Sequence, residues 1–449
     1  ATGKNKIADI VSKAAKTVTL SADAATDVTI SSDVASKGTL TVTGAGKVTL
    51  NTLDTAFDTV DASANTGGIV VTDVDAAETV YTFGSGDDKF TTAADGFATT
   101  DKFAVAAGTG TDTLVVAAAA DLDTAAEAAR YTGFETLSVS DSQDVSLISG
   151  ITAIEMAADT SGVLSGVNAT AADNITVAGT QTTAFTVTLA NATGSADVVS
   201  LDLKNSTSTT NVDVAGLSVA GVETLNLVGS TGTAGTDSDI DFAASGATKL
   251  TAVNLSGTAD MVFDADNTSK KMTVTSTSTG AITVKGAFIK GSSVSTLAGK
   301  DEITLGSNLG VTYDSGAGDD LFTTAEFSYL VATGTDDHVI KAGAGSDTLD
   351  IDKAAPTIID NHFTNVTGLE KLTFAATGDY SITTGTAFKT AFADSVDITS
   401  GTLANGSSFV YAGGLYDKDT TITIAGGALV ADATGENITI TTGAGNDTV

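Results

Sequence analysis

The stretch from Gly299 to Ile351 decides the fold. It contains Gly299-Lys-Asp-Glu-Ile303, Gly316-Ala-Gly-Asp-Asp-Leu-Phe322, Thr335-Asp-Asp-His-Val339 and Gly343-Ala-Gly-Ser-Asp-Thr-Leu-Asp-Ile351. Each copy places an Asp beside a turn, with an apolar residue one or two positions later. The glycines of such a turn allow positive φ and expose backbone carbonyls. The Asp adds a carboxylate, and the apolar residue begins a short strand that faces inward.

The pattern Gly-x-Gly-x-Asp occurs five times, at 84–88, 108–112, 316–320, 343–347 and 443–447, and an apolar residue stands two places beyond each Asp. Looser copies at 299–303 and 334–339 lie beside the strong ones. Stacked turns of this kind bind Ca²⁺ between them in a parallel β-roll. The sequence therefore predicts an all-β fold. We expect parallel β-solenoid or β-roll-like modules with clustered calcium-binding turns and a few short helices.

Ca²⁺ takes roughly six to eight oxygen ligands, so we expect Asp carboxylates supplemented by turn carbonyls. Asp87, Asp319 and Asp336 are either second ligands or solvated side chains. Gly and Asp are also the commonest residues of ordinary β-turns, so each single copy leaves that alternative open. The predicted metal-site residues are Gly84, Gly86, Asp87, Asp88, Gly108, Gly110, Asp112, Asp301, Gly316, Gly318, Asp319, Asp320, Asp336, Asp337, Gly343, Gly345, Asp347, Gly443, Gly445 and Asp447.

The composition restricts the partners. The 449 residues include 55 acidic and 21 basic side chains, for a formal net charge of −34. Nucleic acid and anionic membrane surfaces need basic patches, so the charge argues against both. Cysteine is absent, which excludes disulfides and thiolate zinc sites. No apolar run is long enough to span a bilayer. Because the chain starts without signal-peptide character and ends inside a motif, we expect a fragment of a longer protein.

Short alternating stretches of Thr with Val, Leu or Ile begin at residues 17, 27, 39, 47 and 59, which is the period of half-buried strands. Such strands at near-regular spacing suit either a solenoid or a sandwich. The scarcity of Asn-Gly hairpin turns favours the solenoid. Gly44-Ala-Gly-Lys47 resembles a hairpin turn, and helices are predicted at Lys4–Lys16, at Asp123–Tyr131 with Asp123 as N-cap, and near Pro356.

Three motifs recur in one order. The turns that begin at Gly84 and Gly108 are followed by Gly133-Phe-Glu-Thr-Leu137, and the turns at Gly316 and Gly343 by Gly368-Leu-Glu-Lys-Leu372. This order indicates an internal duplication. The predicted segments are a β repeat (1–66), a first calcium-repeat unit (67–140), a β-solenoid-like segment (141–295), a second calcium-repeat unit (296–375) and a β segment that ends in a truncated third unit (376–449).

The sequence gives little support for catalysis. His338 and His362 are the only histidines, and neither an HExxH zinc motif nor a Gly-x-Ser-x-Gly elbow occurs. His338 is expected in a turn or a solvated position. The recurring Glu135, Glu223 and Glu370 are far apart in the chain, so we expect a structural role for them at strand starts. The prediction is therefore a protein that is not an enzyme.

Clustered calcium repeats followed by a Gly-Phe/Val-Glu-Thr-Leu strand resemble surface-layer (S-layer) proteins of Gram-negative bacteria, of the repeats-in-toxin, type I-secreted group. The stretches from Val187 to Val198 and from Gly221 to Leu227 carry the likeness further. The resemblance covers most of residues 60–449. It implies an extracellular lattice subunit on the cell surface, with Ca²⁺ needed for folding and for contacts between copies. It also implies an anchoring segment, which contacts cell-surface polysaccharide, and a secretion signal, both outside this chain.

Two other functions stay open. A secreted calcium-stabilised adhesin of the same group would stay monomeric with Ca²⁺ and bind a host surface or glycan. A β-helical polysaccharide lyase or epimerase would need basic and aromatic residues clustered on one face of the solenoid. With two His and seven Tyr in the chain, the lyase ranks last.

Overall fold

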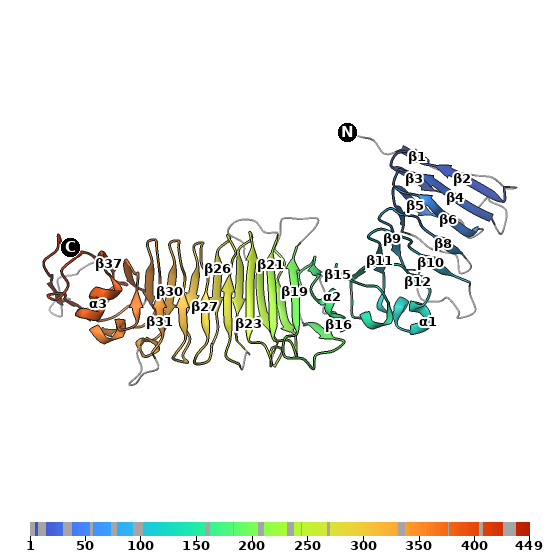
Figure 1. Cartoon of the computed structure of the whole chain (residues 1–449). Coiled ribbons are helices and arrows are strands. Elements are labelled where there is room, and N and C mark those ends of the chain that lie inside the picture. The colour runs from blue at the N-terminus through green and yellow to red at the C-terminus, as the bar shows by residue number, and fades with distance from the viewer. Residues whose placement is uncertain are drawn as a thin grey trace. The chain divides into compact units, whose positions relative to one another are not determined.

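The computed structural model describes residues 5–7, 15–29, 38–53, 57–72, 79–92, 102–157, 162–182, 184–204, 211–230, 238–243, 245–266, 270–330, 337–354, 356–375, 377–403, 407–424 and 437–449. The chain forms two compact units, Ala1–Asp202 and Leu203–Val449, which are described separately. Strands of the described residues pair in parallel in both units, as the arrows in Figure 1 show. The predicted parallel β-solenoid is therefore confirmed, and the sandwich is not formed.

In the first unit, successive strands alternate between facing sheets, so that each coil contributes to both (Figure 1). One sheet consists of β1 (Asn5–Ile7), β3 (Thr26–Thr29), β5 (Val48–Thr52), β7 (Ile69–Val71), β9 (Lys89–Thr91), β11 (Thr113–Val116), β13 (Thr136–Val139), β15 (Ala153–Met156) and β17 (Ile175–Val177). Opposite it lie β2 (Thr17–Ser21), β4 (Gly38–Gly44), β6 (Phe57–Asn65), β8 (Val80–Thr82), β10 (Ala104–Ala106) and β12 (Tyr131–Thr132). A third group consists of β14 (Gln143–Asp144), β16 (Gly162–Val167) and β18 (Phe185–Leu189), and the division between the units falls in β19 (Val198–Leu203).

The second unit continues the same alternation within itself. Its first sheet contains β21 (Thr224–Gly229), β23 (Ala252–Gly257), β25 (Thr273–Ser276), β27 (Ser293–Ser295), β29 (Thr312–Asp314), β31 (Val339–Lys341) and β34 (Val366–Thr367). The facing sheet contains β20 (Val214–Ser218), β22 (Ser238–Phe242), β24 (Met261–Asp264), β26 (Ile282–Lys285), β28 (Glu302–Thr304), β30 (Leu321–Thr324), β32 (Thr348–Ile351), β35 (Lys371–Phe374), β37 (Ser395–Thr399) and β39 (Asp419–Thr423). A smaller sheet is formed by β33 (Thr357–Ile358), β36 (Tyr380–Thr383), β38 (Ser408–Ala412) and β40 (Asn437–Thr441).

Helices are few and short in the described residues. The α-helices are α1 (Ala125–Ala128), α2 (Ala169–Ala172) and α3 (Thr386–Ala391), and the 3₁₀ turns are η1 (Ala119–Leu122), η2 (Val145–Leu147), η3 (Phe327–Tyr329) and η4 (Asp360–Phe363). None of these helices is long and apolar enough to cross a membrane.

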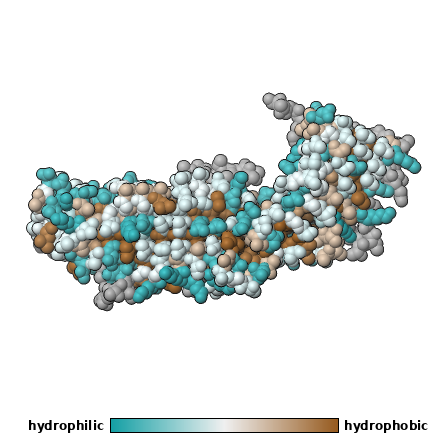
Figure 2. All heavy atoms as spheres, in the orientation of Figure 1, coloured by the Kyte–Doolittle hydropathy of each residue, from teal (hydrophilic) through white to brown (hydrophobic). Residues whose placement is uncertain are grey.

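The core consists of inward-facing residues stacked in register. Alternation along each strand sends every second side chain inward, and parallel pairing without offset places like residues above one another. Each fully buried aliphatic side chain contributes about 1.5–3 kcal/mol relative to exposure. One such stack in the second unit contains Leu225, Val253, Val274, Val294, Tyr313, Ile340 and Val366, which are at most 2% exposed. On the visible face, hydrophilic and near-neutral residues cover most of the surface (Figure 2).

Four local predictions need correction. Gly44-Ala-Gly-Lys47 is not a hairpin turn, because β4 and β5 belong to different sheets and each pairs with a parallel strand of a neighbouring coil. In the range Lys4–Lys16, residues Asn5–Ile7 form strand β1, and most of the rest lies outside the described residues.

The other two corrections concern helix starts. Helix α1 is capped by Thr124 rather than Asp123, because the Thr124 hydroxyl accepts the Glu127 N–H while Glu127 Oε2 accepts the Thr124 N–H. Strand β33 follows Pro356 directly, and the short helical turn there, η4, begins only at Asp360.

Candidate metal-binding columns

Acidic side chains stack along one edge of each unit. We call Asp88, Asp112 and Glu135 the first column, and Asp301, Asp320, Asp347 and Glu370 the second column. Each residue directly precedes a strand of one sheet: β9, β11 and β13 in the first unit, and β28, β30, β32 and β35 in the second. Because these strands are hydrogen-bonded neighbours, the parallel stack brings acids from distant parts of the sequence into one line.

We call each acidic residue of a column a rung. In the first column, hydrogen bonds from backbone N–H groups to carboxylate oxygens join one rung to the next. Asp88 Oδ1 accepts the Ile69 N–H at the start of β7. Asp112 Oδ1 accepts the Asp88 N–H at 2.8 Å, and Glu135 Oε2 accepts the Asp112 N–H at 2.9 Å. Each carboxylate therefore holds the backbone of the coil before it.

The second column repeats these bonds with one more rung. Asp301 Oδ1 accepts the Ile282 N–H at 2.8 Å, at the start of β26. The Asp301 N–H donates to Asp320 Oδ1 and the Asp320 N–H donates to Asp347 Oδ1, both at 2.9 Å. The Asp347 N–H donates to Glu370 Oε2 at 2.9 Å. Both columns therefore begin at an isoleucine N–H and end at a glutamate.

The last glycine turn of each column and the glycine before its glutamate have matching backbone conformations in the two units. Gly108, Gly110 and Gly133 have φ of 95°, 153° and 81°, and their counterparts Gly343, Gly345 and Gly368 have 100°, 152° and 78°. L-residues rarely adopt these angles, which explains the glycines. The duplication seen in the sequence thus extends to the backbone of the last turn and of the glutamate motif, whereas the first turns differ, because Gly84 and Gly86 lack the positive φ of Gly316 and Gly318.

Close approach between coils is the second reason for glycine. A Cβ built on Gly318 would lie 1.5 Å from the Gly299 carbonyl oxygen, and one on Gly345 would lie 1.7 Å from that of Gly318. The predicted positive φ is wrong for Gly84, Gly86, Gly443 and Gly445. A Cβ on Gly84 would still lie 1.9 Å from the Asn65 carbonyl oxygen, and one on Gly443 would lie 1.5 Å from that of Tyr416.

Each aspartate of the columns keeps one buried oxygen that has no hydrogen-bond partner among the described residues. Oδ1 is bonded as described, and Oδ2 is inaccessible and unpaired. The side chains themselves are at most 2% exposed. A buried, unsatisfied carboxylate oxygen costs free energy unless a proton or a cation neutralises it. The five are Asp88, Asp112, Asp301, Asp320 and Asp347.

Burial of these carboxylates also raises their pKa values, because it disfavours the charged form. Burial raises the pKa of Asp88 to about 7, against the lowering effect of the Ile69 hydrogen bond. Burial likewise raises the pKa of Asp112, Asp301 and Asp347 to about 6 and raises that of Asp320. The hydroxyls of Thr296 and Ser315 lower the pKa of Asp301 and Asp320, respectively, although both hydroxyls donate to backbone carbonyls of neighbouring coils.

The donor set fits a hard cation. Carboxylate oxygens and turn carbonyls are the ligands that Ca²⁺ prefers. Among the described residues, no three His, Cys, Asp or Glu side chains converge closely enough to hold a metal ion. A cation at Oδ2 would therefore take most of its ligands from backbone carbonyls, such as those of the stacked glycines.

The outer aspartates bond to backbone rather than to the columns. Asp87 Oδ1 accepts the Thr111 N–H at 3.0 Å, and Asp319 Oδ1 accepts the Ser346 N–H at 2.9 Å. The sequence did not single out Asp419, which accepts the Asn446 N–H at 2.8 Å in the same way. Asp419 lacks the Gly-x-Gly turn that marks the others.

The remaining predicted residues lie apart from the two columns. Asp447 Oδ1 accepts the Thr420 N–H at 3.2 Å, so the last turn repeats the rung geometry. Asp337 precedes β31, a strand of the other sheet, and its Oδ2 accepts a hydrogen bond from Asn365 Nδ2 at 3.4 Å. Asp336 lies outside the described residues.

His338 is buried, so its expected solvated position is wrong. It is 1% exposed, its Nδ1 accepts the Val311 N–H at 3.3 Å, and its Nε2 lies 3.1 Å from the Gly306 carbonyl oxygen. The ring meets Tyr313 edge to face. Burial lowers its pKa. These contacts hold a neutral imidazole between the two ends of the loop 306–311 and so connect the loop to β31.

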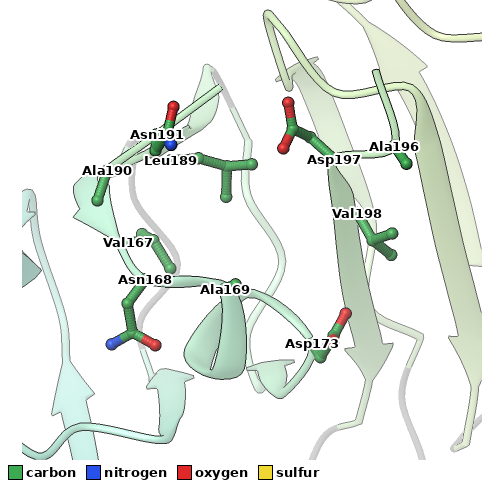
Figure 3. A pocket seen from close by; sticks show the side chains of 10 residues that line it. All are labelled: Val167, Asn168, Ala169, Asp173, Leu189, Ala190, Asn191, Ala196, Asp197 and Val198. Atoms are coloured by element: carbon green, nitrogen blue, oxygen red, sulfur yellow. The ribbon is translucent and has the colours of Figure 1, made fainter. Parts of the chain in front are cut away.

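A cavity of about 520 Å³ lies in the first unit and is lined in part by Ala196, Asp197 and Val198. Asn168 and Asn191 lie on one side of it, and Asp173 and Asp197 lie on the other (Figure 3). Val167, Leu189 and Val198 add small apolar patches. Its ten lining residues include two carboxylates, Asp173 and Asp197, and none of the ten is basic or aromatic.

Comparisons with family models, with curated proteins and with solved structures give no match.

Proposed function

We propose that the chain is a calcium-stabilised structural β-solenoid. The observation that carries the proposal is the set of five buried aspartate oxygens, one for each aspartate of the columns, for which the described part of the chain provides no hydrogen-bond partner. Repeated burial of unneutralised carboxylates in one line is costly unless a cation compensates it. The net charge of −34 adds a general repulsion that bound cations reduce.

The residues that would hold Ca²⁺ are Asp88 and Asp112 in the first column and Asp301, Asp320 and Asp347 in the second. Carbonyls of the glycine turns would complete the shell. The bound ions supply charge neutralisation and clamp neighbouring coils. Extracellular sites of this type bind at about 10⁻⁴–10⁻³ M, which suits a structure that becomes rigid only outside the cell.

The larger role that we propose is that of an S-layer lattice subunit on a bacterial cell surface, with no enzymatic activity. This part rests on the resemblance of the repeats and on the acidic, cysteine-free composition. In such a lattice, copies of the chain are the main partners, and Ca²⁺ bridges acidic surfaces that otherwise repel each other. Cell-surface polysaccharide would be contacted through a segment outside this chain.

Calcium binding is tested by titration calorimetry on chelated protein. Wild type should take up Ca²⁺ with millimolar or tighter affinity, and the D112N and D347N variants should lose part of the stoichiometry. Asp417, an exposed residue paired with Lys389, provides a matched D417N control that should bind as wild type does. Wild type that binds no Ca²⁺ would contradict the proposal.

Lattice formation is tested by electron microscopy of purified protein with and without excess Ca²⁺. A two-dimensional array that dissolves on chelation would support the lattice role. Dispersed particles at all Ca²⁺ concentrations, together with normal Ca²⁺ uptake, would contradict the lattice and favour the monomeric adhesin.

A further inference from the structure

The two glutamates at the column ends make the same side-chain contact as the aspartates, but from a different backbone arrangement. Glu135 Oε2 and Glu370 Oε2 accept the N–H groups of Asp112 and Asp347, just as an aspartate Oδ1 does one coil earlier. Their side chains thus occupy the next rung. The additional methylene of Glu allows its carboxylate to reach the N–H of the preceding aspartate, although the backbone at the Glu is hydrogen-bonded differently from the backbone at an Asp.

The two kinds of residue differ in the hydrogen bonds that their backbone N–H groups make. At an aspartate rung, only the residue after the Asp donates to the carbonyl below, as Thr348 N–H does to Asp320 O at 2.8 Å. At the end of the second column, both Glu370 N–H and Lys371 N–H donate to Asp347 O, at 3.0 and 2.9 Å. The glutamate N–H therefore points back, and no N–H remains for another carboxylate.

The first column ends in the same way. Glu135 N–H and Thr136 N–H both donate to Asp112 O, at 3.1 and 2.9 Å. The positive φ of Gly133 and Gly368, two residues before each Glu, produces the turn. Identical bonds at two places more than 200 residues apart make this a motif rather than a local accident.

We propose that Glu135 and Glu370 are terminal caps that end each carboxylate column and position the last aspartate for its ligand. They are positioning residues: each fixes the backbone N–H of Asp112 or Asp347, and through it the orientation of that carboxylate. The motif Gly-apolar-Glu thereby sets where a column ends. The ligand side of this inference rests on the proposed function, whereas the capping side does not.

The test compares amide hydrogen exchange of residues 343–351 in four single variants, with Ca²⁺ and with EDTA. E370A removes the acceptor, E370D shortens the side chain by one methylene, and E370Q keeps an acceptor without the charge. E302A is the matched control, because Glu302 is an exposed glutamate on β28 of the same sheet and is not in a strand next to β32 or β35. A lost bond to a charged acceptor should accelerate Asp347 exchange by at least about tenfold.

We expect E370A and E370D to show this acceleration, E370Q a smaller one, and E302A none. E370A exchange at Asp347 equal to that of E302A would overturn the inference, as would acceleration confined to residues 371–374. If E370A does not fold, E135A and the 108–116 segment of the first unit decide in the same way. Wild type that binds no Ca²⁺ would remove the proposed function, while the exchange data in EDTA would still decide the cap.

Discussion

The first and second columns are built from the same parts but differ in length. Both start at the N–H of an isoleucine, Ile69 or Ile282, and both end at a glutamate. The first contains two aspartates and the second contains three. Since the glutamate closes one end in both, length is decided by how many coils before it carry the glycine turn and the aspartate. The column is therefore modular, and each coil contributes one rung.

The two columns also differ in how tightly their coils pack at the glycines. A Cβ on Gly318 in the second column would lie 1.5 Å from the Gly299 carbonyl oxygen, whereas one on Gly110 in the first would lie 2.6 Å from the Gly86 carbonyl oxygen. Both glycines have positive φ. The second column should therefore tolerate substitution less well.

The largest expected effect comes from a methyl group at these glycines. G318A should destabilise the second unit by about 3 kcal/mol or more, because the clash with backbone adds to the cost of positive φ. G110A should cost less. Denaturant unfolding in excess Ca²⁺ measures both, with G414A as control, since nothing lies within 4 Å of a Cβ there. Equal losses of stability in G110A and G318A would show that the cost arises from positive φ alone and not from the spacing between coils.

The second-largest expected effect concerns Asp320, the middle aspartate of the second column, where the effect of a substitution on stability should differ between EDTA and Ca²⁺. In EDTA, D320N should leave stability unchanged or raise it, because it removes a buried charge that lacks compensation. In Ca²⁺ it should lower stability by about 1.4 kcal/mol for each tenfold loss of ligand-linked stabilisation. Thermal unfolding of D320N and wild type in both conditions measures the reversal. For D88N in the shorter column, the difference between the stability changes in EDTA and in Ca²⁺ should be smaller. A D320N variant that is destabilised in both EDTA and Ca²⁺ would contradict the prediction.

The pH dependence should follow the raised pKa values. In EDTA, the folded state keeps protons on Asp88 up to about pH 7 and on Asp112 and Asp347 up to about pH 6, where the unfolded chain has lost them. The folded state binds more protons, so stability should fall as pH rises from about 4 to about 7.

The control for this prediction must separate the columns from His338. Burial lowers the pKa of His338, so below its usual value the unfolded chain takes up a proton that the folded chain does not, and stability falls with falling pH. The difference between wild type and D88N/D112N cancels that contribution. A difference that does not change between pH 5 and pH 8 would mean that these aspartates stay ionised in the folded protein.

How far the sequence predicts these columns can be judged from single residues. The Gly-x-Gly-x-Asp spacing identified Asp88, Asp112, Asp320 and Asp347, because turn glycines and carboxylates have a local pattern. For Glu370 the sequence predicted a structural role at a strand start but not the partner, because that partner is the backbone N–H of Asp347 on another coil, 23 residues earlier. Such contacts depend on the register of the stack, which local patterns do not specify.

The failed predictions have the same origin. Gly44-Ala-Gly-Lys47 has the composition of a hairpin, but the flanking strands pair with other coils. His338 follows two acids in sequence and yet is covered by the loop 306–311 from the preceding coil. Periodicity predicts strands, glycines predict turns, and neither says which coil lies over which.

The smallest expected effect tests the first rung of the second column, where a leucine stands in the turn. Leu297 takes the place that Gly316 and Gly343 occupy in the next coils, since the Ala317 N–H donates to Leu297 O as the Ala344 N–H does to Gly316 O. Leu297 has φ of 67° and is 50% exposed. For a residue with a Cβ, this conformation costs about 1–2 kcal/mol.

Replacement by glycine should relieve this cost, offset in part by the greater freedom of glycine in the unfolded chain. We expect L297G to raise the free energy of unfolding by about 0.5–1 kcal/mol in Ca²⁺, measured by denaturant unfolding. L297A keeps the Cβ at positive φ, so it should not be stabilised and serves as the matched variant. Stabilisation of both variants alike would mean that the exposed leucine side chain, rather than the backbone at this rung, carries the cost.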